Sequence, residues 1–162
     1  SRSILISGPE MSQPQKEFLR RAAGKHPQTE FCEFTDDLLS VMNAADVVIS
    51  MAGYNTVCEV LSLNKRAVVI PRVRPTEEQL IRAERMAARG LFSFIHPDNL
   101  TPATLKDAVS KELTRANVSF QEPEMDALPR LTAALSLSLR EPERAMAKAA
   151  SFNFDAFTPV FA

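Results

Sequence analysis

The chain has 162 residues, a length that fits one domain of ordinary size. Hydrophobic residues make up 45% of it and charged residues 24%, proportions typical of a globular protein and not of a disordered one. The net charge of −1 gives no general attraction for nucleic acid, and no apolar run approaches the roughly 20 residues that span a bilayer.

Short apolar runs alternate with amphipathic segments along the chain. In chain order the pattern predicts a strand at 4–7, a helix at 13–23, a strand at 30–34, a helix at 38–44, a strand at 46–50, a helix at 54–63, a strand at 67–70, a helix at 77–89, a strand at 91–95 and helices at 101–113 and 125–139. Local signals mark several ends. Gly8-Pro9 is a turn after the first strand, Asp36 or Asp37 can cap the second helix, and Gly90 stops the helix at 77–89.

The predicted strands are continuous apolar runs rather than alternating ones, which indicates strands covered on both faces. The regular alternation of strand and helix predicts an α/β fold, a Rossmann-like doubly wound parallel sheet with helices on both faces. Residues 1–120 would form this domain, 121–145 a C-terminal helix, and 146–162 a Phe-rich tail of unassigned role. Because the sequence starts at Ser1 without Met or a signal-peptide pattern, we expect a piece of a longer chain.

Ligands of an open α/β sheet bind beyond the carboxyl ends of its strands, and the loop 50–56 is the most informative segment there. Gly53 lets the backbone turn tightly and lie close to a ligand. The following helix N-terminus offers N–H groups and a positive dipole end to a diphosphate. Glu59 suits ribose hydroxyls, from which it can accept hydrogen bonds. The alternative is that Thr56-x-x-Glu59 is a capping box, which would start the helix at Val57.

Neighbouring loops carry further candidates. Arg72 and Arg74 follow the strand at 67–70 and suit phosphate recognition, or they belong to a solvated loop with surface ion pairs. Phe34 either stacks on a base or belongs to the core. No metal site is expected, because the two histidines and two cysteines have no ligand spacing, and both cysteines are expected to be buried thiols.

Several motifs at consistent spacing carry a resemblance to a known family. They are Glu33-Phe34-Thr35-Asp36-Asp37-Leu38, Ala45-Asp46-Val47-Val48-Ile49-Ser50, Gly53-x-x-Thr56-x-x-Glu59, Val69-Ile70-Pro71 and Gln79. Between Ile4 and Val109 the chain resembles the C-terminal, donor-binding domain of family 28 glycosyltransferases, which is one half of a GT-B fold. Within the family it resembles the peptidoglycan UDP-GlcNAc transferases. The run Arg72-x-x-Pro75-x-x-Glu78-Gln79-x-x-Arg82-Ala83 resembles a bacterial subgroup of predicted glycosyltransferases.

The resemblance implies a UDP-sugar donor, UDP-GlcNAc-like, and no cofactor. The positions it assigns to the nucleobase are Phe34, Thr35 and Leu38, and those it assigns to the diphosphate are Gly53, Tyr54, Asn55 and Thr56. It assigns the ribose to Glu59 and the donor sugar to Gln79. Arg72 is included in the candidate site because its guanidinium suits phosphate recognition, and not because of the resemblance. Arg82 stands where the peptidoglycan enzymes have an asparagine of the sugar-reading region, so the identity of the sugar is open. The family's catalytic base and acceptor site belong to an N-terminal domain, so no catalytic residue is expected in this chain.

The favoured hypothesis is the donor-binding portion of a hexosyltransferase. An acceptor hydroxyl would displace the nucleoside diphosphate from the anomeric carbon, with the helix dipole and nearby arginines stabilising the leaving group and without a metal. Two alternatives stay open: a fragment of a UDP-GlcNAc 2-epimerase-like enzyme, and a non-catalytic soluble subunit of a split glycosyltransferase. The expected partners are a UDP-sugar and an N-terminal acceptor domain or partner chain, with a homo-oligomer open and nucleic acid excluded. The expected location is the cytoplasm, or the inner membrane surface for the full-length enzyme.

A last expectation concerns the sheet. The family domain opens with a strand that would precede residues 4–7, and in the order 3-2-1-4-5-6 that strand is central. Strands 4–7 and 30–34 would then lie on one side of a gap, and strands 46–50 and 67–70 on the other. Direct pairing of the two inner strands, a strand from the Phe-rich tail or a strand from another chain could close the gap. We expect direct pairing first, because it needs no new element, and with it a donor site distorted near Gly8 and Gly53.

Overall fold

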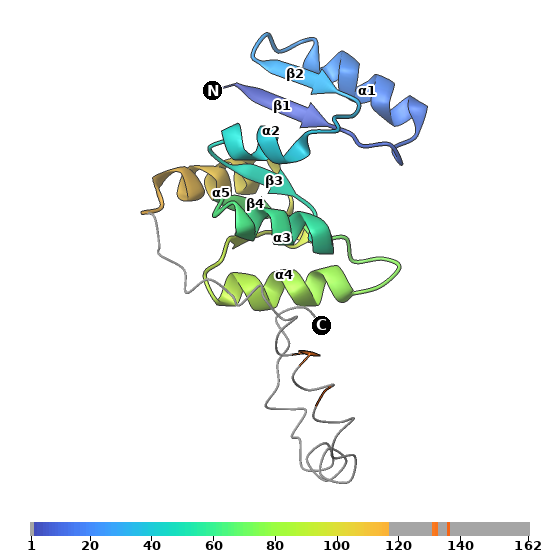
Figure 1. The fold of residues 1–162 in the computed structure, drawn as a ribbon. Helices are drawn as coiled ribbons and strands as arrows, with labels where there is room; N and C mark the ends of the chain where they lie inside the picture. Colours follow the sequence, from blue (N-terminus) through green and yellow to red (C-terminus); the bar gives the residue numbers. More distant parts are fainter. Residues whose placement is uncertain (1, 117–130, 133–135, 137–162) are drawn as a thin grey trace. The chain divides into compact units, whose positions relative to one another are not determined.

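The computed structural model describes residues 2–116, 131–132 and 136, and the chain divides into two compact units, Ser1–Ala44 and Ala45–Ala162. The elements, labelled in Figure 1, are β1 Ser3–Ile6, α1 Gln13–Ala23, β2 Thr29–Cys32, α2 Leu38–Ala44, β3 Val48–Ser50, α3 Tyr54–Ser62, β4 Ala67–Val69, α4 Glu78–Ala88, β5 Ser93–Phe94, the 3-10 helix Pro97–Asn99 and α5 Pro102–Thr114. Every element predicted between residues 4 and 113 is present, and most of the strands are shorter than predicted. Of the predicted helix at 125–139 only residues 131, 132 and 136 lie within the description, and these are helical. The Phe-rich tail lies outside the described residues.

The first unit is a two-stranded parallel sheet with a helix on it. β1 pairs in parallel with β2, and α1 packs against β2. Charged side chains fasten the helix to the end of this sheet. Arg20 donates a hydrogen bond to Glu33, and the buried Lys16 places its Nζ 4.0 Å from the same carboxylate.

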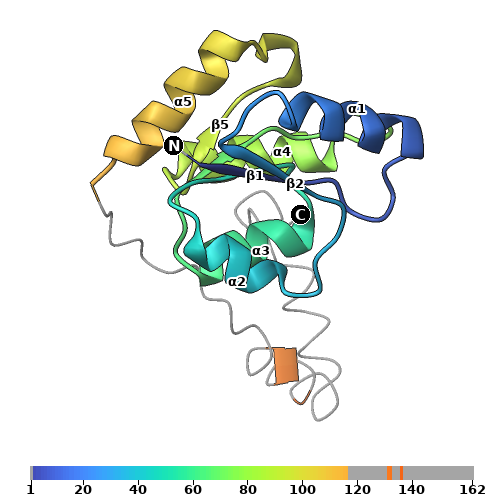
Figure 2. The same ribbon diagram turned by 90° about the horizontal axis from the view of Figure 1, so that it is seen from above.

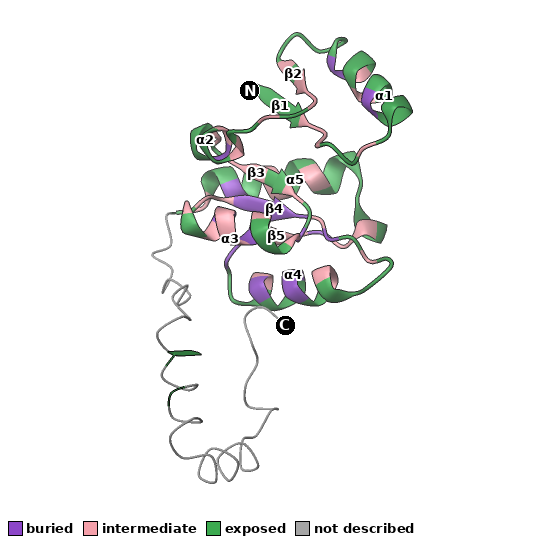
Figure 3. Ribbon diagram, turned by 45° about the vertical axis from the view of Figure 1, so that its right-hand side comes forward, coloured by how far each residue is buried: buried purple, intermediate pink, exposed green. Residues whose placement is uncertain are grey.

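The second unit is a three-stranded parallel sheet in the order β3-β4-β5. Seen from two directions, α3 and α5 lie on opposite sides of this sheet (Figures 1 and 2). The middle strand forms the centre of the core, because all three residues of β4 are 0% exposed (Figure 3). Side chains from the helices complete this core: Val57 and Val60 of α3, and Ala83 and Met86 of α4.

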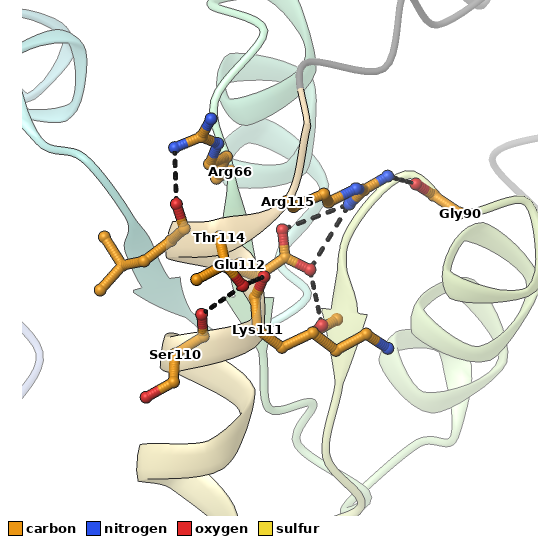
Figure 4. Close-up of polar contacts among 9 residues, drawn as sticks. Arg66, Gly90, Ser110, Lys111, Glu112, Thr114 and Arg115 are labelled. Carbon is orange, nitrogen blue, oxygen red and sulfur yellow. Dashed lines mark hydrogen bonds and ion pairs between the residues drawn. The ribbon is translucent and has the colours of Figure 1, made fainter.

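A buried carboxylate organises the amino edge of this sheet, where the strands begin. Glu112 of α5 is 1% exposed and accepts hydrogen bonds from Ser93 Oγ at 2.6 Å and from Arg115 Nη1 at 3.2 Å (Figure 4). Arg115 also donates to the carbonyl of Gly90, which precedes β5. Arg66, just before β4, donates to the carbonyl of Leu113 at 3.2 Å. The carboxylate and the two arginines thus join the C-terminal end of α5 to the starts of β4 and β5.

The prediction of a Rossmann-like α/β fold with parallel strands is confirmed. Gly90 ends α4 with a positive φ of 74°, and the N–H of Leu91 returns to the carbonyl of Met86, as expected of a helix stop. The expectation that every strand is covered on both faces is wrong for β1, where Ile4 is 53% exposed.

The pairing within each unit follows the doubly wound order. β1 pairs with β2 in one sheet, and the other sheet has the order β3-β4-β5. Direct pairing of the two inner strands, a strand from the tail and a strand from another chain all stay hypotheses for the gap between the two groups. No helix among the described residues combines the length and apolar character needed to cross a membrane.

Candidate functional site

The N-terminus of α3 is the centre of the candidate site. Gly53 is its N-cap residue in an extended conformation, and the first helical hydrogen bond runs from Val57 N–H to the Gly53 carbonyl at 3.0 Å. The backbone N–H groups of Asn55 and Thr56 have no hydrogen-bond acceptor among the described residues. The helix therefore presents open donors beyond the carboxyl end of β3. The capping-box alternative, in which the helix would start at Val57, is wrong because α3 starts three residues earlier, at Tyr54.

Gly53 occupies this place for a reason that the sequence did not indicate. Its φ is −61° and its ψ is 142°, angles that any residue adopts, so the expected tight turn is wrong. A Cβ atom at this position would meet only Thr56 Oγ1, at 3.9 Å. The missing side chain leaves open space over the helix N-terminus. The distortion expected at Gly53 is likewise not found, because the cap and the first helical bond are regular.

Glu59 lies on the same helix, one turn beyond the open donors. Residues three and four apart are neighbours on a helix surface, so Glu59 lies beside Thr56 and Asn55. Glu59 is half-buried, and its carboxylate has no hydrogen-bond or ion-pair partner within the described part of the chain. A partly desolvated carboxylate without a donor is ready to accept hydrogen bonds from a ligand.

Arg82 of α4 connects to the loop before α3. Its side chain is 2% exposed, and its Nη1 donates to the carbonyl of Ala52 at 2.8 Å. Its Nη2 pairs with Glu78, one turn earlier on α4, and its guanidinium carbon lies 5.7 Å from the centroid of the Tyr54 ring. Arg82 therefore contacts the residues on both sides of Gly53. The sequence marked Arg82 as a departure from the relatives but gave no signal of its burial.

Two buried polar atoms beside this loop have no partner among the described residues. They are the Oγ of Ser50, at the end of β3, and the Nε of Arg82. Buried polar groups are nearly always hydrogen-bonded, so two such atoms without a partner are unusual. Both atoms flank the segment that leads from β3 into α3.

The loop between β4 and α4 brings two of the predicted residues together. The side-chain oxygen of Gln79 accepts a hydrogen bond from the backbone N–H of Arg72 at 3.1 Å. The side chains of Arg72 and Arg74 are exposed.

The predicted nucleobase residues lie in the first unit, after β2. Phe34 is 62% exposed, so the core alternative is wrong. Thr35 Oγ1 accepts the N–H of Asp37 at 3.1 Å, and Asp37 in turn accepts the N–H of Ser40 at 3.2 Å, which caps α2 as predicted. Leu38 is the first residue of that helix and is half-buried. The two cysteines are half-buried free thiols rather than fully buried ones.

Solved structures identify the class of fold. The glycotransferase of kitacinnamycin matches with a TM-score of 0.53 and 19% identity, over 71% of this chain and 35% of that protein. The spinosyn forosaminyltransferase matches with a TM-score of 0.56 and 16% identity, over 83% of this chain and 44% of that protein. These likenesses define the fold as that of one half of a GT-B glycosyltransferase.

Sequence comparison then gives the family. The model of the glycosyltransferase family 28 C-terminal domain matches residues 2–140, so the chain belongs to this family. A UDP-N-acetylglucosamine--N-acetylmuramyl-(pentapeptide) pyrophosphoryl-undecaprenol N-acetylglucosamine transferase from Clostridium kluyveri is 32% identical over 84 residues, which are 51% of this chain and 24% of that protein. The transferase of the same name from Haemophilus influenzae is 32% identical over 91 residues, 56% of this chain and 26% of that protein. The matched part thus spans about a quarter of the length of these relatives.

Proposed function

We propose that this chain is the donor-binding part of a glycosyltransferase that takes a UDP-sugar. The observation that carries the proposal is the arrangement on α3. Its N-terminus has a glycine with open space beside it and two backbone N–H groups without an acceptor, and Glu59 one turn further on has a carboxylate without a partner, all counted among the described residues. A nucleoside diphosphate offers the complementary groups in the same order, because its charged phosphates adjoin a ribose with two hydroxyls.

Each group of residues has a role in this proposal. The N–H groups of the segment 53–56 and the helix dipole hold the diphosphate, as helix N-termini do for other anions. Glu59 accepts hydrogen bonds from the ribose, and Gln79 contacts the donor sugar. Phe34, Thr35 and Leu38 hold the nucleobase. Arg72 adds an exposed positive charge for the phosphates.

The chemical step is displacement at the anomeric carbon. The acceptor hydroxyl forms a bond to that carbon while the bond to the diphosphate breaks, and the diphosphate leaves with the bonding electrons. The dipole of α3 stabilises this leaving group where its charge develops. The base that takes the hydroxyl proton, and the acceptor site, belong to the other half of the enzyme.

The donor sugar and location are inferred from the relatives. Their name specifies transfer of N-acetylglucosamine from the UDP-sugar to a pyrophosphoryl-undecaprenol acceptor. We infer a UDP-GlcNAc-like donor for this chain and a place in the cytoplasm, at the inner membrane surface, for the whole enzyme.

Titration calorimetry with UDP, ADP and GDP tests the proposal. We expect UDP to bind more tightly than the other two nucleotides. The Glu59→Ala variant should lose roughly 1–3 kcal/mol of binding free energy, the range of hydrogen bonds to a charged group.

The matched control is Glu84→Ala, which removes an exposed carboxylate from α4 and should leave UDP binding unchanged. Equal binding of the three nucleotides would contradict the nucleobase assignment. An unchanged affinity in the Glu59 variant would contradict the ribose assignment.

A further inference from the structure

The segment between β3 and α3, residues 51–53, is called the donor loop here. It is short, and its own side chains do little to hold its shape. Within the run 51–54, Ala52 is 0% exposed, whereas the two end residues, Met51 and Tyr54, are 57% and 51% exposed. Gly53 between them has no side chain that could pack. The shape of this loop, and with it the direction of the N–H groups that follow, therefore depends on a contact from elsewhere in the fold.

That contact comes from Arg82, thirty positions further along the chain. Its Nη1 holds the Ala52 carbonyl at 2.8 Å, and its guanidinium lies over the Tyr54 ring. Because the guanidinium is planar, the two contacts fix the carbonyl before Gly53 and the residue after it in one geometry. Glu78 pairs with the remaining Nη2 and offsets the charge of the buried arginine.

We propose that Arg82 is a positioning residue for the nucleotide-diphosphate loop, acting through Ala52 and Tyr54 rather than by touching the ligand. The identity of the ligand in this inference rests on the proposed function, whereas the contacts of Arg82 with the loop do not depend on it. A loop held in this way before the ligand arrives loses less freedom on binding, so the affinity for a diphosphate rises.

The contacts of Arg82 support a positioning role rather than a direct one. Its hydrogen bonds go to the Ala52 carbonyl and to Glu78, and its guanidinium lies over the Tyr54 ring. At 2% exposure, its side chain has little surface that a ligand could reach.

Three variants of the 162-residue chain test the inference. Arg82→Met keeps an unbranched apolar stem and removes both contacts, and Arg82→Lys keeps one donor for the Ala52 carbonyl. Arg85→Met is the matched control, because Arg85 lies on the same helix, is exposed and has no partner among the described residues. Two quantities are measured well below the melting temperature: the Kd for UDP, and the hydrogen exchange of the amides of residues 51–56 without ligand.

We expect Arg82→Met to weaken UDP binding about tenfold, the effect of about one lost hydrogen bond to a charged group. Its loop amides should exchange faster than those of the native chain, while the amides of β4 stay protected. Arg82→Lys should recover part of both effects, and Arg85→Met should match the native chain in both.

Three results would overturn the inference. Unchanged exchange in residues 51–56 with weaker UDP binding would mean that Arg82 contacts the ligand directly. Unchanged UDP affinity with a lower melting temperature would mean a purely structural role. Faster exchange throughout the second unit would mean that no particular loop is held. If the native chain fails to bind UDP, the proposed function is wrong, while the exchange measurement still decides whether Arg82 holds the loop.

Discussion

The two edges of the three-stranded sheet in the second unit are built differently. At the amino edge, Glu112 is 1% exposed and both of its carboxylate oxygens are paired with side chains from neighbouring segments (Figure 4). At the carboxyl edge, the N–H groups of Asn55 and Thr56 and the carboxylate of Glu59 have no partner within the part of the chain that the structure describes. The amino edge is a closed network and the carboxyl edge is an open one.

This contrast separates stability from binding. A fully paired carboxylate needs nothing further and serves only to join the elements around it. Unpaired donors have a free-energy cost in the empty protein, and a ligand with acceptor oxygens can remove that cost. Changes at the amino edge should therefore affect unfolding, and changes at the carboxyl edge should affect nucleotide binding.

The largest effect is expected at the amino edge. Glu112→Ala leaves the Arg115 guanidinium and the Ser93 hydroxyl without their buried acceptor. Removing one partner of a buried ion pair costs about 3 kcal/mol or more, so the free energy of unfolding in urea should fall by that amount. The Kd for UDP of the folded variant should stay within about twofold of the native value, which is less than 0.5 kcal/mol.

The comparison breaks if the Glu112 variant binds UDP much more weakly at a temperature where it is folded. It also breaks if its stability is unchanged, because the network would then contribute nothing. Glu84→Ala again serves as the control, and an exposed carboxylate of this kind should change stability by no more than about 0.5 kcal/mol.

Much of the fold could be predicted from the sequence, because its signals are local. The helices α1 and α2 begin and end where the amphipathic pattern and the cap at Asp37 indicated. The parallel arrangement followed from the alternation of strands and helices. The grouping of β1 with β2, and of β3 with β4 and β5, also followed from the doubly wound order.

The candidate site was predictable in position and less so in mechanism. The segment 53–56 and Glu59 lie at the start of α3, as expected. The interaction of Arg82 with Ala52 joins residues 30 positions apart, so no local spacing in the sequence indicates it. A glycine at a helix cap likewise does not reveal whether it serves a turn or an open space, and only its φ of −61° decided the question.

Gly53→Ala is the sharpest test of the open edge. The change keeps a conformation that alanine adopts, and its methyl group meets only Thr56 Oγ1 at 3.9 Å. Alanine is a poorer N-cap than glycine, so stability should fall by less than about 1 kcal/mol. UDP affinity should fall about tenfold, or 1.4 kcal/mol, because the methyl group occupies space reserved for the diphosphate.

Calorimetry and urea unfolding of the Gly53 variant give both numbers. Gly24→Ala is the matched control, since this glycine also has a negative φ and lies at the end of α1 in the first unit. A stability loss larger than the loss of binding would show that Gly53 serves the fold, and the contrast between the two edges would then fail at this residue.

The smallest effect is expected at Gln79, where the question is which atom of the side chain matters. Its oxygen already accepts a hydrogen bond from the N–H of Arg72 at 3.1 Å. The amide NH₂ group is therefore the part of the side chain that we expect to contact a donor sugar. Gln79→Glu keeps the acceptor and removes that donor, while Gln79→Ala removes both. If the NH₂ group contacts the sugar, both variants should bind UDP normally and should lose about 1 kcal/mol of the affinity for UDP-GlcNAc, the value of one ordinary hydrogen bond. If Gln79 only shapes the loop, Gln79→Glu should bind both ligands as the native chain does, because the bond to Arg72 survives. Competition calorimetry with UDP and UDP-GlcNAc separates these outcomes, and it shows whether the open edge reads the sugar or only the nucleotide.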